Sequence, residues 1–260
     1  MGVLNVTPDS FSDGGAFLEP RDALRRLGEM GAQGAVICDV GAESTRPGSA
    51  SVSAEEQLRR LDPVLRAVAS GCDVAISIDT SSAAVARAAL DAGAVLVNDV
   101  TAGRADPDLL PVVAEREAAV CLVHMLGDPQ TMQQGPRYED VTAEVGRFLE
   151  ERLAAAVAVG IPESHVLLDP GIGFGKRLED NLTLLRELPR LAELGRPLVV
   201  GVSRKSMFDK LLGRAVDERL AGSLAAGLLA IDHGASVLRV HDIRETADAI
   251  GVWRAMKGAG

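Results

Sequence analysis

Aromatic residues, cysteines and long apolar stretches are all scarce in this chain of 260 residues. Only 3% of the residues are aromatic although 47% are hydrophobic, so alanine, valine, leucine and isoleucine must build the core. Such residues suit strands that are packed between helices. The three cysteines, Cys38, Cys72 and Cys121, lack metal-ligand spacing, and two of them lie in apolar runs. We therefore expect buried free thiols in a reducing compartment rather than a disulfide framework.

Other absences exclude further classes of protein. No apolar stretch is long enough to span a bilayer, and the chain does not open on a charged segment followed by an apolar one, which predicts a soluble, cytoplasmic protein. The formal net charge of −10 argues against a nucleic-acid surface. No compact group of histidine, cysteine and carboxylate residues suggests zinc, and no Ser-His-Asp or Cys-His arrangement stands out.

What the sequence does contain is a regular alternation of short apolar runs with helix-like spacings. The runs expected to be strands are residues 2–6, 35–40, 74–78, 94–97, 119–123, 166–168, 198–202 and 237–240. The expected helices include 53–69 with a capping box of Ser53 and Glu56, 182–194, one that runs to Ala230, and a final helix capped by Asp242 and Glu245.

This order of elements predicts the fold class. Eight strands alternate with eight helices over residues 1–260, without a linker or a low-complexity segment, which is typical of an α/β protein built as a single-domain (β/α)8 TIM barrel. A doubly wound open sheet is the alternative. It is disfavoured because the G-x-G-x-x-G that such a sheet carries after its first strand is missing.

Polar residues gather where the predicted strands end. In a (β/α)8 barrel the carboxyl ends of all strands meet on one face, and that face carries the chemistry. Here it would hold Asn5, Asp39, Asp79, Asn98, His124, Asp169, Lys205, Arg239 and His241. Since the strand bodies are almost entirely apolar, this face is the predicted active site.

Asp79, Asn98 and Asp169 offer oxygen acceptors from three of these strand ends. Acceptors inside a barrel mouth need strong donors to offset their lost hydration, and a flat heterocycle with an amino group and ring N–H groups would supply them. The alternatives are a helix cap for Asp79, a turn amide for Asn98, and a turn residue before Pro170 for Asp169.

Arg46, Lys205, Arg239 and His241 are the basic counterpart of the acceptors. Arg239 and His241 alternate on the last predicted strand and so point the same way. Because the last two strands of such barrels often hold a phosphate, a mono- or diphosphate is the expected ligand. The amide oxygen of Asn5 could bind a Mg²⁺ that shares those phosphates. The alternative is that Arg239 pairs with a neighbouring carboxylate and that His241 is an ordinary rim residue.

Several motifs together resemble one family. From Met1 to the last helix the chain contains, in order, GVLNVTPDSFSDGG, ESTRPG, SIDT, VND, DPGIGFGK, GVSRKS and RVHD, and in these it resembles the dihydropteroate synthases. The resemblance implies a transferase of folate synthesis that sulfonamides target. It would join 6-hydroxymethyl-7,8-dihydropterin pyrophosphate to p-aminobenzoate and release pyrophosphate, by an SN1-like route through a pterin cation. The family also implies Mg²⁺ as a cofactor and a homodimer.

The resemblance implies roles for three groups of residues. The pterin would lie against Asp79, Asn98, Val100, Met125, Asp169, Phe174, Gly201 and Lys205. The pyrophosphate would be held by Asn5, Arg46, Arg239 and His241, with Asn5 also a ligand of Mg²⁺. p-Aminobenzoate would contact Phe11, Thr45, Arg46 and Ser206 when the loops at residues 7–15 and 41–49 close. Asp13, Arg46 and Lys205 would be catalytic, with Asp13 stabilising the cation.

The chain departs from the family at two points. Family members usually carry a β-hairpin before the first strand, whereas this chain begins at that strand, and Ala42 stands where the family commonly has glycine. Two other functions stay open. A methyltransferase that uses methyltetrahydrofolate shares the pterin acceptors but has no use for ESTRPG and SRKS. A non-catalytic pterin-binding paralogue would have no reason to keep both substrate pockets.

Overall fold

Eight parallel strands form the centre of the protein. The structure is a computed structural model that describes residues 1–6, 19–43, 52–128 and 131–258. Its strands are β1 (Gly2–Asn5), β2 (Ile37–Gly41), β3 (Ala75–Asp79), β4 (Leu96–Asp99), β5 (Ala119–Val123), β6 (Val166–Asp169), β7 (Leu198–Val200) and β8 (Ala235–Leu238). They are hydrogen-bonded in sequence order, so each strand pairs with the next one along the chain.

The sheet closes on itself between its first and last strands. The amino group of Met1 donates to the carbonyl oxygen of Leu238 at 3.0 Å, and the amide of Val3 donates to that of Val240 at 3.0 Å. Gly2 and Val240 also form a parallel bridge. The fold is therefore the predicted (β/α)8 barrel.

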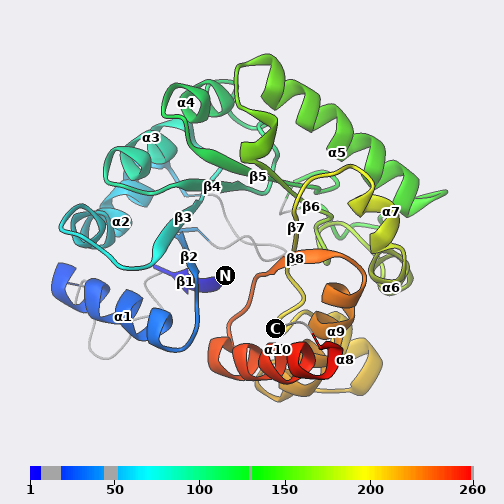
Figure 1. The fold of residues 1–260 in the computed structure, drawn as a ribbon. Helices are drawn as coiled ribbons and strands as arrows, with labels where there is room; N and C mark the ends of the chain where they lie inside the picture. The colour runs from blue at the N-terminus through cyan, green and yellow to red at the C-terminus, as the bar shows by residue number, and fades with distance from the viewer. Residues whose placement is uncertain (7–18, 44–51, 129–130, 259–260) are drawn as a thin grey trace.

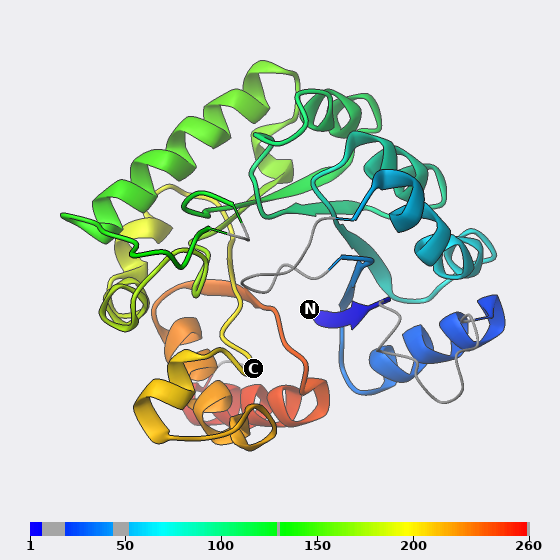
Figure 2. The ribbon, with the colours of Figure 1, turned by 180° about the vertical axis from the view of Figure 1, so that it is seen from behind.

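Helices surround the strands on the outside, as Figures 1 and 2 show from opposite sides. They are α1 (Pro20–Ala32), α2 (Ala54–Ala69), α3 (Ala83–Asp91), α4 (Leu109–Glu115), α5 (Val141–Ala158), α6 (Leu178–Arg186), α7 (Leu188–Ala192), α8 (Met207–Leu212), α9 (Leu220–Asp232) and α10 (Ile243–Lys257). Short 3-10 turns lie at Glu163–His165 and Val216–Glu218. None of the described helices is long and apolar enough to cross a membrane.

The apolar side chains fill two spaces. Because side chains alternate along a strand, one set faces the helices and the other faces the barrel interior. The interior set forms a cluster of its own, made of Leu96, Cys121, Val123 and Val199. Cys38 and Cys121 are buried and all three cysteines are free, which confirms the prediction of free thiols.

Two predicted helices are each divided. The helix expected over residues 182–194 starts earlier, at Leu178, and is split into α6 and α7. Pro189 in the first turn of α7 lacks the N–H that a continuous helix would need there. The helix expected to run to Ala230 is split into α8 and α9 after Gly213, which ends α8 with a left-handed φ of 63°.

The predicted helix caps have mixed outcomes. At the start of α2 the Ser53 hydroxyl accepts a hydrogen bond from the Glu56 amide at 3.3 Å, as predicted. The cap predicted at Asp242 is wrong, because its side chain makes no capping bond to α10 and instead pairs with Arg204.

The last strand lies earlier in the chain than predicted. β8 ends at Leu238, so Arg239 follows the strand instead of lying within it.

Candidate active site

Three predicted site residues share one level of the barrel. The strand register pairs Asn5 with Gly41, Gly41 with Asp79, and Asp79 with Asn98. All four residues stand at or near the carboxyl ends of their strands, which is the catalytic face of this fold. Asp79 and Asn98 are buried, whereas Asn5 is half-buried at the rim.

Asp39 lies two residues before the end of β2 and is completely buried. Its carboxylate accepts hydrogen bonds from the Ser77 hydroxyl at 2.6 Å, the Asn98 amide nitrogen at 3.0 Å and the Arg239 Nε at 2.7 Å. Donors from β3, β4 and the segment after β8 therefore compensate for the lost hydration of this buried charge. The sequence pattern predicted Asp39 at the catalytic face but indicated no role for it.

Arg239 bridges two buried carboxylates. Its Nε pairs with Asp39, and its Nη2 donates to Asp79 Oδ2 at 2.7 Å. Burial opposes the charge of the guanidinium, but the two aspartates outweigh it and raise the pKa of Arg239 above its usual value. The structure thus confirms the alternative in which Arg239 pairs with a neighbouring carboxylate.

Asn98 has an acceptor that nothing in the described structure satisfies. Its amide nitrogen is bound by Asp39, which turns the opposite atom, Oδ1, away from that carboxylate. This buried oxygen has no hydrogen-bond partner. An unsatisfied buried polar atom costs about 1–3 kcal/mol, so it is a sign of a ligand that donates a hydrogen bond there.

Asp79 and Asp169 are the other acceptors at the mouth. Burial raises the pKa of both carboxyl groups, and for Asp79 the nearby Arg239 opposes the rise. Asp169 ends β6, and one of its oxygens accepts a hydrogen bond from the Gly171 amide at 2.7 Å. The carboxylates of both residues are therefore available to a ligand that brings its own N–H groups.

The segment after β6, residues 170–177, is held by a buried lysine. Lys176 is 2% exposed, and its Nζ lies 2.9 Å from the Gly171 carbonyl oxygen, 3.1 Å from that of Phe174 and 2.9 Å from the His124 Nδ1. Burial is the main reason why the pKa of His124 falls to about 2, and it also lowers that of Lys176 to about 7. The neutral imidazole can accept a hydrogen bond from the ammonium group.

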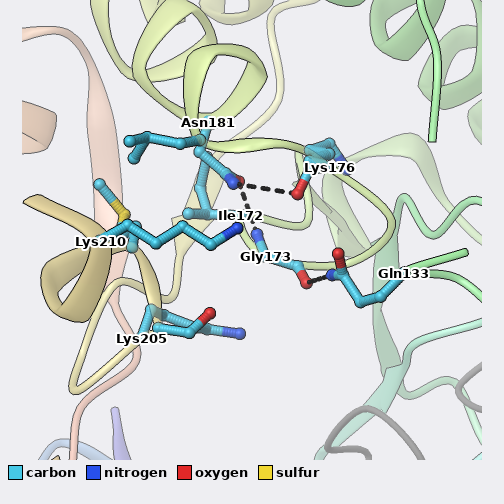
Figure 3. Close-up of a pocket in the computed structure, with 10 residues that line it drawn as sticks. Gln133, Ile172, Gly173, Lys176, Asn181, Lys205 and Lys210 are labelled. Carbon is cyan, nitrogen blue, oxygen red and sulfur yellow. Dashed lines mark hydrogen bonds between the residues drawn. The ribbon is translucent and has the colours of Figure 1, made fainter. Parts of the chain in front are cut away.

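Lys205 lies against this segment from the β7 side of the barrel. Its Nζ is 4.2 Å from the centre of the Phe174 ring, close enough for a cation–π contact. Burial, together with the charge of Arg239, lowers the pKa of Lys205 to about 8. Figure 3 shows the pocket beside it, lined by Gln133, Ile172, Gly173, Lys176, Leu178, Asn181, Lys205, Ser206, Met207 and Lys210.

Apolar residues from the predicted pterin set lie together beside these polar groups. Val100 and Met125 form a buried cluster with Met132, and Phe174 packs against it. Gly201 stands directly opposite Arg239, with an added Cβ 3.9 Å from the Arg239 Cβ. The structure thus brings Asp79, Asn98, Val100, Met125, Asp169, Phe174, Gly201, Lys205 and Arg239 to one region by contact or strand register.

The remaining predictions concern the rim. His241 is exposed, and its Nδ1 lies 3.1 Å from the Ser203 hydroxyl. Ser206 is exposed immediately before α8. The predicted residues Phe11, Asp13, Thr45 and Arg46 lie outside the described residues.

The site supplies few ligands for a metal ion. Among the residues with described positions, no group of three or more histidine, cysteine, aspartate or glutamate side chains could hold one. The half-buried Asn5 offers one amide oxygen at the end of β1. Such a donor suits Mg²⁺, which keeps several waters and takes its other ligands from substrate phosphates.

Known proteins with this sequence pattern are pterin enzymes. The family model described as pterin binding enzyme matches residues 1–241. The dihydropteroate synthase of Escherichia coli (strain K12) is 48% identical over 259 residues, which cover 100% of this chain and 92% of that protein. The chain belongs to the dihydropteroate synthase family.

Solved structures of this family have the same fold. The Yersinia pestis dihydropteroate synthase in a sulfonamide drug complex has a TM-score of 0.93 at 44% identity, covering 100% of this chain and 94% of that one. The Xanthomonas albilineans enzyme with 4-aminobenzoic acid has a TM-score of 0.92 at 46% identity, covering 100% and 93%. In complex with 7,8-dihydropteroate it has a TM-score of 0.88 at 44% identity, covering 100% and 94%.

Proposed function

We propose that this protein condenses 6-hydroxymethyl-7,8-dihydropterin pyrophosphate with p-aminobenzoate, forming 7,8-dihydropteroate and pyrophosphate. The observation that carries the proposal is the unpartnered Oδ1 of Asn98, buried on the same level as Asp79. A pterin presents an amino group and ring N–H groups to such acceptors. The Xanthomonas relative holds 4-aminobenzoic acid and 7,8-dihydropteroate, which are a substrate and the product of this reaction.

The pterin lies in the barrel mouth with its donors toward Asp79, Asn98 and Asp169. Its flat ring lies against the apolar cluster that contains Met125 and Phe174, whose contacts orient it. Lys205, which lies over the Phe174 ring, donates to a ring acceptor of the pterin. The acidic and basic groups of the site thereby each meet a complementary group of the ligand, which offsets their burial.

The pyrophosphate lies at the rim, beside Asn5, Arg46, Arg239 and His241. Arg239 binds Asp39 through its Nε and Asp79 through its Nη2. Its third nitrogen, Nη1, would donate to the phosphate. Asn5 would hold a Mg²⁺, which would neutralise charge on the leaving pyrophosphate. Basic side chains add to this stabilisation as the carbon–oxygen bond breaks.

The reaction needs no strong base, because the amino group of p-aminobenzoate is already a neutral nucleophile. The electron-rich pterin stabilises a cation at its methylene carbon after pyrophosphate leaves, so the route is SN1-like. Asp13 stabilises that cation, and Phe11, Thr45, Arg46 and Ser206 complete the p-aminobenzoate site.

The proposed function also implies where the protein works and how it assembles. The protein works in the cytoplasm, as expected for a soluble biosynthetic enzyme with three free cysteines. It assembles as a homodimer, by analogy with the family. Several exposed leucines and valines on α8, α9 and the turn between them, Leu211, Leu212, Val216 and Leu229, support an apolar contact there.

The test is pyrophosphate release from the pterin pyrophosphate, measured with and without p-aminobenzoate and Mg²⁺. We expect Mg²⁺-dependent release, with dihydropteroate forming when p-aminobenzoate is added. In Asn98→Leu the pterin loses an acceptor, so the KM for the pterin pyrophosphate should rise about 10- to 100-fold.

Thr142→Val is the matched control for that variant. Thr142 also carries a buried oxygen without a partner, but it lies in the first turn of α5, and the proposed function gives it no part in binding. Its removal should leave both KM values unchanged. Tight pterin binding by the wild type without product would contradict the proposed reaction and favour a non-catalytic pterin-binding protein.

A further inference from the structure

Lys176 is a buried charged residue to which the proposed reaction gives no part. It follows directly after the glycine-rich stretch Gly171–Gly175 and lies entirely inside the protein. A buried ammonium group is costly unless every proton finds an acceptor. Here the three protons have three close acceptors, on Gly171, Phe174 and His124.

The backbone that Lys176 binds has an unusual conformation. Gly171, Gly173 and Gly175 have φ values of 66°, 86° and 65°, which residues with side chains rarely adopt. Glycine lowers the strain of such a path but leaves it with high conformational entropy in the unfolded chain. A segment of this kind needs fixed contacts to keep one shape.

Lys176 supplies these contacts from both sides. Two of its acceptors, the Gly171 and Phe174 carbonyl oxygens, lie within the glycine-rich stretch, and the third, His124, follows the end of β5. The ammonium group therefore ties the stretch to the neighbouring strand end. Tyr138, whose hydroxyl donates to the Gly175 carbonyl at 2.7 Å, adds a contact farther along.

Two site residues depend on the shape of this stretch. The Gly171 amide donates to Asp169, which fixes the rotation of that carboxylate. The Phe174 ring packs on the cluster of Val100 and Met125, and the Lys205 ammonium group lies over the ring in a cation–π contact. A shift of the Gly171 or Phe174 carbonyl thus moves an acceptor, an apolar wall and a cation of the pterin site together.

From this geometry we propose that Lys176 is a positioning residue, which holds the stretch Gly171–Gly175 so that Asp169 and Phe174 meet the pterin. The inference rests on the proposed function for its ligand. Lys176 itself touches no substrate, since its Nζ is surrounded by protein acceptors.

The experiment compares the wild type with Lys176→Met, which keeps most of the length of the side chain and removes all three donors. We expect the KM for the pterin pyrophosphate to rise about tenfold or more, with a smaller change in the KM for p-aminobenzoate. Lys176→Gln retains an amide donor and should lie between the two. Lys257→Met, which removes an exposed lysine at the end of α10, is the control.

A second readout does not depend on activity. The amides of Gly171, Gly173 and Phe174 donate to the Asp169 carboxylate, the Asn181 side-chain oxygen and the Gly171 carbonyl oxygen, so their hydrogen exchange reports the order of the segment. Exchange at these amides should quicken in Lys176→Met and not in Lys257→Met. This measurement separates the two proposals: without activity in the wild type the function fails, and the exchange still decides the role of Lys176.

Three results would overturn the positioning role. One is a folded Lys176→Met variant with an unchanged KM for the pterin pyrophosphate. Another is exchange at residues 171–174 that is the same as in the wild type. The third is loss of folding in both Lys176 variants, because Lys176 would then support the barrel as a whole and not this segment.

Discussion

Asp39 fixes the orientation of the residue that points most directly to a ligand. An asparagine side chain can turn its oxygen and nitrogen to either side, and Asp39 selects one of these states by accepting from the Asn98 nitrogen. The same carboxylate holds Arg239. The orientation of Asn98 and of Arg239 therefore depends on a carboxylate that is itself completely buried.

Replacement of Asp39 by asparagine tests this dependence. An amide cannot accept from Ser77, Asn98 and Arg239 as a carboxylate does, and it leaves the half-buried guanidinium of Arg239 with one carboxylate fewer. Asp39→Asn should lower the free energy of unfolding by about 2–4 kcal/mol and raise the Kd for the pterin about 10- to 100-fold. Urea unfolding and calorimetric titration measure the two effects.

Ser77→Ala is the control for Asp39→Asn. It removes one hydrogen bond to Asp39 and leaves those from Asn98 and Arg239 in place. The expected cost is about 1 kcal/mol of stability with little change in pterin affinity. Equal effects of the two substitutions on affinity would contradict the orienting role of Asp39.

The strand-end rule explains which site residues could be predicted. Asp79, Asn98 and Asp169 each close an apolar run, so their place on the catalytic face followed from the sequence. The role of Asp39 did not follow, because its partners Ser77 and Arg239 are 38 and 200 residues away in the chain. A charged residue inside an otherwise apolar strand was the available signal, since it requires a buried partner.

At the scale of elements, the connection between β6 and α6 is the most constrained segment of the site. The chain turns back on the end of β5 so closely that a Cβ on Gly171 would overlap the carbonyl oxygen of His124. Gly175 is similarly close to Leu126. These glycines let two neighbouring connections pack without side chains between them.

Gly171→Ala should therefore disturb the site more than alanine substitution at a left-handed glycine usually does. The alanine must adopt a φ near 66° and also displace His124, so we expect a loss of about 3 kcal/mol or more in stability and a large rise in the KM for the pterin pyrophosphate. Thermal or urea unfolding together with steady-state kinetics measures both.

Gly213→Ala provides the comparison for the backbone alone. Gly213 has almost the same φ, 63°, but nothing lies within 4 Å of an added Cβ. Its substitution should cost about 1–2 kcal/mol and leave both KM values unchanged. If the two alanine variants lost equal stability, close packing on His124 would not be the constraint.

Element boundaries were less predictable than element types. The apolar spacing over residues 182–194 continues through Pro189, so the pattern indicated one helix where the missing N–H produces two. At Asp242 a local capping pattern competed with a distant partner, Arg204, 38 residues away, and the ion pair prevailed. Both errors come from reading local spacing without the third dimension.

Across the whole molecule, the closed barrel places several ionisable groups where water is scarce. The barrel mouth contains charged residues as well as an apolar cluster. Its buried charged residues, which lie close to Lys205 and Arg239, are Asp39, Asp79, Asp169 and Lys176. The fold was predictable because its alternation of strands and helices is regular over the full chain. The balance of these charges was not, because it depends on burial and on distances that only the closed barrel defines.

This arrangement makes the stability of the protein depend on pH in the alkaline range. Burial, together with the charge of Lys205, lowers the pKa of Lys176 to about 7 in the folded state, whereas an unfolded lysine has a pKa of about 10.4. Between these two values the unfolded chain binds more protons than the folded one. The contribution of Lys176 to stability must therefore rise with pH across that window, by at most about 1.4 kcal/mol per pH unit.

The difference in the free energy of unfolding between the wild type and Lys176→Met isolates this contribution, because the other titrating groups are common to both proteins. We expect the difference to shift in favour of the wild type as the pH rises from 7 to 10, measured by urea unfolding at intervals of one pH unit. Lys257→Met, on the surface of α10, controls for the loss of a lysine as such. A difference for Lys176→Met that stays constant with pH would mean that the folded barrel leaves the proton affinity of Lys176 unchanged, and burial in the closed barrel would then not govern its charge.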